Sequence, residues 1–187
     1  MRPFHFTAAV LVLAAFSAAA FAPAAKPVAS IQELMAGVID PAADAVWESL
    51  SSETGPNGIE EHFPRTAAEW AALRKGALDI VGAAKLLQVD GRPVSHGQPL
   101  EDADVPGIST APQIRQAIDA DRAAFNARAR ELHAAGRQVL AAIDARSPQR
   151  LLAAGEKLDA ACERCHAAYW YPNAAQPAWP APLTKAP

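Results

Sequence analysis

Apolar residues at every seventh position constrain the fold of this chain more than any other sequence feature. The repeat comprises Ile118, Phe125, Leu132 and Val139. Seven residues make almost two helical turns, so these side chains share one stripe, which is typical of a helix packed lengthwise against other helices. Ser109 or Thr110 can cap the start of such a helix, and Pro112 suits its first turn. The repeat therefore predicts a long helix that begins near Thr110.

Two segments nearer the N-terminus show the same helical spacing. The first starts at Ser30, and its expected inward residues are Ile31, Leu34, Met35, Val38 and Ile39. Because Pro41 cannot donate a backbone N–H, this helix should kink there or restart with Asp40 as a cap. The second follows Thr66, where Glu69 completes a capping box. Its expected inward residues are Trp70, Leu73, Ala77, Ile80, Ala84 and Leu87.

The last predicted helix begins with Ser147 as its cap and Pro148 at its first position, and it ends near Tyr171. Its inner face is expected to carry Leu151, Leu158, Cys162, Cys165 and Tyr169. Segments 51–65 and 89–112 are rich in Gly and Pro and predict irregular connections. No stretch alternates with a period of two, so no sheet is expected. The pattern predicts an all-α fold, an antiparallel four-helix bundle.

Residues 1–24 have the pattern of an export signal. Arg2 precedes an apolar run that starts near Phe6, and small residues allow cleavage after Ala20 or Ala24. The alternative is an uncleaved membrane anchor, because about 18 or more apolar residues can span a bilayer. The Ala-rich run favours cleavage, so we expect a periplasmic protein with no stable membrane insertion after the signal is removed.

Composition limits the remaining possibilities. The chain has 187 residues, of which 51% are hydrophobic, and can bury one core of ordinary size. We assign 25–172 to a single domain and 173–187 to a Pro-rich tail. The formal charge of -3 and the scattered Lys and Arg residues provide no basic stripe, so no nucleic-acid partner is expected. No nucleophile with a base and no Gly-rich phosphate loop is present, so we expect no enzyme.

The motif CERCH, residues 162–166, contains both cysteines of the chain. C-x-x-C-H is the attachment signature of c-type haem, in which two thiols form thioethers with the porphyrin and the adjacent imidazole meets the iron. On a helix, Cys162, Cys165 and His166 lie within an arc of about 100°, so all three face one side. The motif predicts one covalent haem c near the end of the last helix.

Other roles for the two cysteines are weaker. A structural zinc site needs four ligands, and the nearest further histidine, His133, lies on another predicted helix. A disulfide between Cys162 and Cys165 would close a very small loop and stabilise little. A thioredoxin-like motif needs a βαβ context, which is missing.

With its export signal, helical pattern and single CERCH near the C-terminus, the chain resembles the class II c-type cytochromes, meaning cytochrome c′ and its low-spin relatives. The resemblance implies that Cys162 and Cys165 carry the thioethers and that His166 is the proximal iron ligand. Family members often pair through their helices, which implies a possible homodimer. The low-spin members place a methionine ligand on the first helix, and Met35 occupies a similar position.

Met35 is the one methionine that remains after export. In an up-down-up-down bundle, the start of the first helix lies beside the end of the fourth, so Met35 and His166 should fall at the same end. We therefore expect Met35 as the second axial ligand of the iron, the alternative being ordinary core packing. Competing ligands are His62, His96 and His133. His62 is the first to test, because a loop can fold over a haem edge.

Other side chains can complete a haem site. The aromatic candidates for its walls are Trp47, Trp70, Tyr169 and Trp170. The basic candidates for pairing with the haem propionates are Arg65, Lys85, Arg92 and Arg164.

The sequence thus predicts a periplasmic mono-haem cytochrome that carries single electrons between redox partner proteins. One alternative is a five-coordinate protein of the cytochrome c′ kind, whose open iron position binds NO or CO. Another is an exported helical protein without haem that uses its two cysteines for redox chemistry or metal binding.

Overall fold

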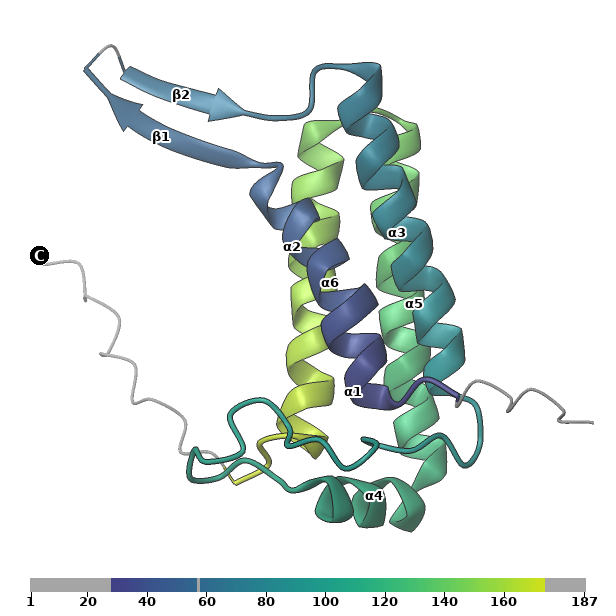
Figure 1. Ribbon diagram of the computed structural model, residues 1–187. Helices are drawn as coiled ribbons and strands as arrows, with labels where there is room; N and C mark the ends of the chain where they lie inside the picture. Colours follow the sequence, from purple (N-terminus) through teal and green to yellow (C-terminus); the bar gives the residue numbers. More distant parts are fainter. Residues whose placement is uncertain (1–27, 57, 174–187) are drawn as a thin grey trace, which may run out of the picture.

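The computed structural model describes residues 28–56 and 58–173 (Figure 1). The predicted export signal, 1–24, lies outside the described residues, and so does the tail after Asn173. Within the described ranges, no helix is both long enough and apolar enough to cross a membrane.

Most of the described chain is helical, as the sequence predicts. The helices are α1 (Ile31–Leu34), the π-helix η1 (Met35–Ile39), α2 (Asp40–Glu48), α3 (Ala67–Leu87), α4 (Ala111–Ala120), α5 (Arg122–Asp144) and α6 (Pro148–Tyr169). Figure 1 shows α3, α5 and α6 side by side along their length, with α1, η1 and α2 forming a continuous segment against them.

The predicted caps start the helices where expected. The Ser30 hydroxyl accepts a hydrogen bond from the Glu33 N–H at 3.1 Å, and the Glu33 carboxylate accepts from the Ser30 N–H. Thr66 and Glu69 form the same reciprocal pair at the start of α3. Ser147 caps α6, with Pro148 as its first residue. These bonds satisfy backbone N–H groups that have no partner inside the helix.

The first helix passes Pro41 through a wide turn. The Asp40 N–H donates to the Met35 carbonyl, five residues back, which defines η1. A proline ring collides with the carbonyl four residues before it, and widening the preceding turn relieves that contact. Asp40 itself has helical backbone angles and follows Ile39 without a side-chain cap. The predicted restart with Asp40 as a cap is therefore wrong.

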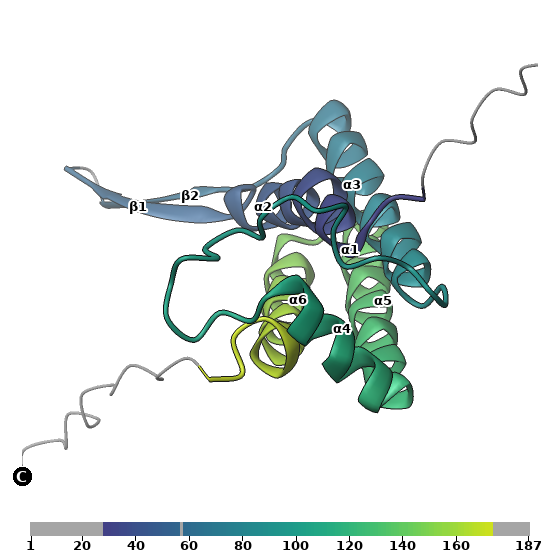
Figure 2. The ribbon, with the colours of Figure 1, turned by 60° about the horizontal axis from the view of Figure 1, so that its bottom comes forward.

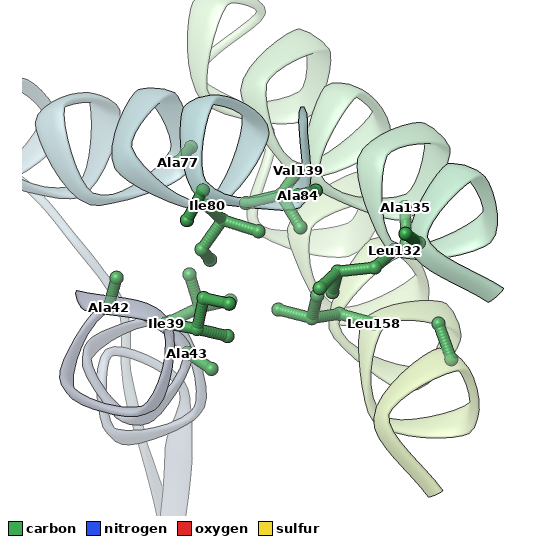
Figure 3. Close-up of a cluster of buried hydrophobic side chains, with 14 of the residues drawn as sticks. Ile39, Ala42, Ala43, Ala77, Ile80, Ala84, Leu132, Ala135, Val139 and Leu158 are labelled. Atoms are coloured by element: carbon green, nitrogen blue, oxygen red, sulfur yellow. The ribbon is translucent and has the colours of Figure 1, made fainter. Parts of the chain in front are cut away.

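One apolar core lies between these segments. All six predicted inward residues of α3 are buried, and so are the four residues of the seven-residue repeat. Figure 3 shows Ile80 and Ala84 of α3, Val139 of α5, Leu158 of α6 and Ile39 of η1 around this core. Gly136 lets α3 and α5 approach closely, because a Cβ atom there would lie 3.0 Å from the Ile80 Cγ2.

The prediction that 51–65 contains no strand is wrong. Residues 51–55 and 58–62 form an antiparallel hairpin, β1 (Ser51–Gly55) and β2 (Gly58–His62), where a loop and no sheet were expected. Both faces of the hairpin are exposed, so no apolar alternation marks it in the sequence. Gly58 has a φ of 117° at the turn, a conformation that favours glycine.

The long helix predicted from Thr110 is divided at Asp121. The backbone of Asp121 leaves the helical region, and its carboxylate accepts a hydrogen bond from the Ala124 N–H at 2.9 Å, which caps α5. An aspartate that caps a following helix competes with helix continuation. The repeat still predicted burial correctly, because Ile118 in α4 and Phe125 in α5 both face the core.

The connection from Gln88 to Thr110 has no regular element, as predicted. Figure 2 shows it running around the end of the molecule where α4 lies. Its Pro93 and Val94 carbonyls accept hydrogen bonds from the Ile31 and Gln32 N–H groups at 2.9 and 3.0 Å. Its Ser109 N–H donates to the Trp170 carbonyl at 2.6 Å. The connection is thus tied to the start of α1 and to the end of α6.

Candidate functional site

A cavity of about 460 Å³ lies at this end of the molecule. Its walls come mainly from α1, η1, α2, α5, α6 and the connection before α4, with Leu87 of α3 and Ile114 of α4, and they are mainly apolar. The apolar side chains include Ile31, Ile39, Leu100, Ile114, Phe125 and Leu132. Cavities that hold cofactors are commonly about 300–1,000 Å³, apolar, and supplied with a few well-placed polar groups.

Cys162, Cys165 and His166 all lie on the wall of this cavity. They occupy one side of the C-terminal turns of α6, in agreement with their spacing on a helix. Both cysteines are free thiols and partly buried. Burial raises the pKa of each thiol to about 11, with Asp159 and Asp40 adding to the effect at Cys162. At neutral pH both side chains are therefore neutral thiols.

The His166 imidazole is held among aromatic rings. The Trp170 ring meets it edge-on, with centroids 5.1 Å apart and planes at 84°, and the Tyr171 ring lies 6.2 Å away. The His166 carbonyl accepts hydrogen bonds from the Trp170 and Tyr171 N–H groups, which turns the chain at the end of α6. Burial lowers the pKa of His166, against the opposing effect of Glu163 and Asp40. Lowering favours the neutral imidazole, the form that binds metals.

Met35 lines the same cavity from the first residue of η1. It is partly buried and packs against the apolar core. The structure thus brings Met35 to the cavity that carries Cys162, Cys165 and His166.

The other predicted ligands lie elsewhere. His62 ends strand β2 and is exposed, His133 lies on α5, and the Nε2 atom of His96 is 3.0 Å from the Val28 carbonyl. None of these three histidines is among the residues that line the cavity.

The aromatic candidates divide in a similar way. Trp47, Tyr169 and Trp170 line the cavity, whereas Trp70 is buried in the core away from it. Tyr169 meets the Phe125 ring edge-on, with centroids 5.2 Å apart. Three of the four predicted aromatic residues therefore lie on the cavity wall.

Sequence reasoning missed the arginine of this site. None of Arg65, Lys85, Arg92 and Arg164 lines the cavity. Arg128 does, and its Nη1 donates to both carboxylate oxygens of Glu131 at 3.1 Å. Burial raises the pKa of Glu131, but hydrogen bonds from Arg128 and Arg164 outweigh it and leave the pKa below its ordinary value. The position of Arg128 could have identified it, because it follows Phe125 by three residues and therefore lies beside the buried stripe of α5.

The residues present fit a haem of the c type. Two neutral thiols three residues apart and an adjacent imidazole share one wall, and the cavity around them is apolar and of cofactor size. Among residues 28–56 and 58–173, no group of three or more His, Cys, Asp or Glu side chains is placed to hold a metal ion. Haem iron needs no such group, because the porphyrin occupies its equatorial positions and the protein supplies only axial ligands.

Comparison of the chain with protein families, with curated proteins and with solved structures finds no match. The CERCH motif and the cavity that it lines are therefore the features of this chain that point to a function.

Proposed function

We propose that this protein is a periplasmic c-type cytochrome that carries one covalent haem and transfers single electrons between proteins. One observation carries the proposal: Met35, far from the CERCH motif in the sequence, lines the same apolar cavity as Cys162, Cys165 and His166. Mutual placement of thiols, imidazole and thioether around one such cavity is what a c-type site with two axial ligands requires.

We also propose an antiparallel four-helix bundle of the class II cytochrome kind as the architecture. The segment from α1 to α2, together with α3, α5 and α6, surrounds one core, which supports this assignment. The CERCH motif lies in the last of these helices, as the resemblance to that family implies.

Each residue has a separate part in this function. Cys162 and Cys165 would hold the haem through thioethers, and the His166 imidazole and the Met35 sulfur would bind its iron. Haem iron supplies a one-electron couple between its ferric and ferrous states. The apolar side chains of Phe125, Ile39 and Leu132 line the cavity and would limit contact between water and the haem, which would lower the local dielectric constant and strengthen nearby charge interactions.

The first experiment is to express the full chain with its export signal in a host that attaches haem c. Mass spectrometry of the exported protein should show one added haem, and the double variant Cys162→Ser/Cys165→Ser should lack it. The oxidised protein should give a low-spin EPR signal and the far-red sulfur-to-iron charge-transfer band. An unmodified mass would refute the haem assignment, and a high-spin spectrum that shifts with NO or CO would instead indicate a gas-binding protein.

A further inference from the structure

A groove of about 360 Å³ adjoins the cavity where α2 faces α6. Trp47 lines both the groove and the cavity, and its indole N–H donates to the Gly155 carbonyl at 3.4 Å, joining the two helices. Leu50 and Leu152 line the groove, and Leu152 is 57% exposed. The groove thus presents an apolar surface to the solvent.

Carboxylates lie on both sides of the groove between α2 and α6. Asp40 is on the α2 side, and Glu156, Asp159 and Glu163 are on the α6 side. All four are exposed, and each lines the cavity or the groove. Asp40 and Asp159 both act on the pKa of Cys162, after burial, so the two sides converge beside the haem motif. We call these four carboxylates with Trp47, Leu50 and Leu152 the acidic seam.

No basic side chain in the part of the chain that the structure describes forms an ion pair with a carboxylate of the acidic seam. Asp40, Glu156 and Asp159 form no ion pair there, and Glu163 accepts a hydrogen bond only from the Tyr171 hydroxyl, at 2.5 Å. Some other helical carboxylates are paired, for example Asp144 with Arg74 at 2.8 Å. The seam therefore keeps a local negative potential, which a cationic surface would lower.

We propose that the acidic seam is the docking surface for a redox protein that presents lysine or arginine side chains around an apolar centre. Charge complementarity speeds encounter and sets orientation, and an apolar centre with a polar rim is the usual anatomy of a protein interface. This inference rests on the proposed function, because docking at the seam brings the partner to the edge of the haem cavity.

The test uses the haem-loaded protein and a lysine-rich, positively charged single-haem cytochrome as the probe. Stopped-flow mixing measures the second-order rate constant for electron transfer at low and high salt. In the triple variant Asp40→Asn/Glu156→Gln/Asp159→Asn, the rate constant at low salt should fall by about tenfold, within the range of electrostatic steering. The dependence of the rate on ionic strength should become correspondingly weaker.

The matched control removes three equal charges from the hairpin, which begins directly after Leu50 and projects away from the helices (Figure 1). All three of its glutamates are exposed, so Glu53→Gln/Glu60→Gln/Glu61→Gln changes net charge by the same amount. This variant should react with the basic cytochrome within about twofold of the natural chain. A small uncharged quinol, used as the electron donor, reports changes at the haem itself.

The outcomes separate the two proposals. If haem is present and both triple variants lose the same rate, net charge alone matters and the docking proposal is wrong, while the cytochrome function stands. If the seam variant is as fast as the natural chain, or slows equally with the quinol, docking at the seam is also wrong. If mass spectrometry shows no haem, the proposed function and this inference fail together.

Discussion

Met35 and His166 are far apart in the sequence but line one cavity. Met35 lies at the start of η1, and His166 lies near the end of α6. A widened turn before Pro41 follows Met35 directly, and π-helical turns of this kind are frequent at functional sites. The relationship makes Met35 the side chain on which the ligand assignment depends.

Substitution of Met35 by leucine should separate ligation from packing. Leucine keeps an apolar side chain of similar volume but has no sulfur, so the stability cost should be below about 1.5 kcal/mol. We expect the haem-loaded variant to lose the low-spin EPR signal and the sulfur-to-iron band. A variant that retains both would show that Met35 is only packing. The parallel change Met35→Ala would then lower the free energy of unfolding by up to about 2–5 kcal/mol without altering the spectrum.

The thiols of the haem-free protein should react slowly. Burial raises the pKa of Cys162 and Cys165 from an ordinary 9.0 to about 11. At pH 8 the thiolate fraction should therefore be about a hundredfold smaller than in the unfolded chain. Iodoacetamide alkylation, followed by mass spectrometry on protein made without its export signal, should be slower by this factor than in urea. Circular dichroism must first show that this protein is helical.

The same shift has a consequence for stability. A group whose pKa is higher in the folded state favours folding below its unfolded pKa, and that contribution is lost as the pH rises further. The haem-free fold should therefore weaken between about pH 9 and 11, as urea unfolding can measure. Equal alkylation rates for folded and unfolded protein at pH 8 would contradict the burial of these thiols.

Two helical glycines should respond in opposite directions to alanine. Gly82 is exposed in the middle of α3, with no atom within 4 Å of an added Cβ. Gly82→Ala should raise the free energy of unfolding by about 0.5–1 kcal/mol. Gly136→Ala places its Cβ 3.0 Å from the Ile80 Cγ2 and 3.2 Å from the Val81 Cγ2. That overpacking should lower the free energy of unfolding, since such changes cost about 1–3 kcal/mol. If urea unfolding shows that both substitutions stabilise the protein, α3 and α5 must lie farther apart at Gly136 than the structure has them.

Asp121 should stabilise the start of α5. Its carboxylate accepts from the Ala124 N–H at 2.9 Å, and Asp121→Ala should lower the free energy of unfolding by about 1 kcal/mol, as for other helix caps. Asp119→Ala is the control, because Asp119 forms only a surface pair with Arg115 at 3.5 Å, worth about 0–1 kcal/mol. Equal effects in thermal or urea unfolding would indicate an undivided helix at Asp121.

Helix starts and buried faces could be predicted from the sequence because their causes are local. Ser30, Thr66 and Ser147 each bond a backbone N–H within one turn, and the buried stripe of α3 follows from helical periodicity. The hairpin formed by β1 and β2 could not be predicted, because its side chains are exposed on both faces and leave no apolar pattern. The break at Asp121 could not be predicted, because the apolar repeat continues across it.

Part of the candidate site could likewise be predicted from local sequence spacing, and part depends on the tertiary structure. The motif at 162–166 determined by itself that two thiols and an imidazole share one side of a helix, since three- and four-residue spacings suffice for that. Only the tertiary structure decided which other side chains line the same cavity: Arg128 from α5, Leu100 from the long connection, and carboxylates from both α2 and α6. Such meetings depend on how helices and connections pack in space, and no spacing along the chain encodes them.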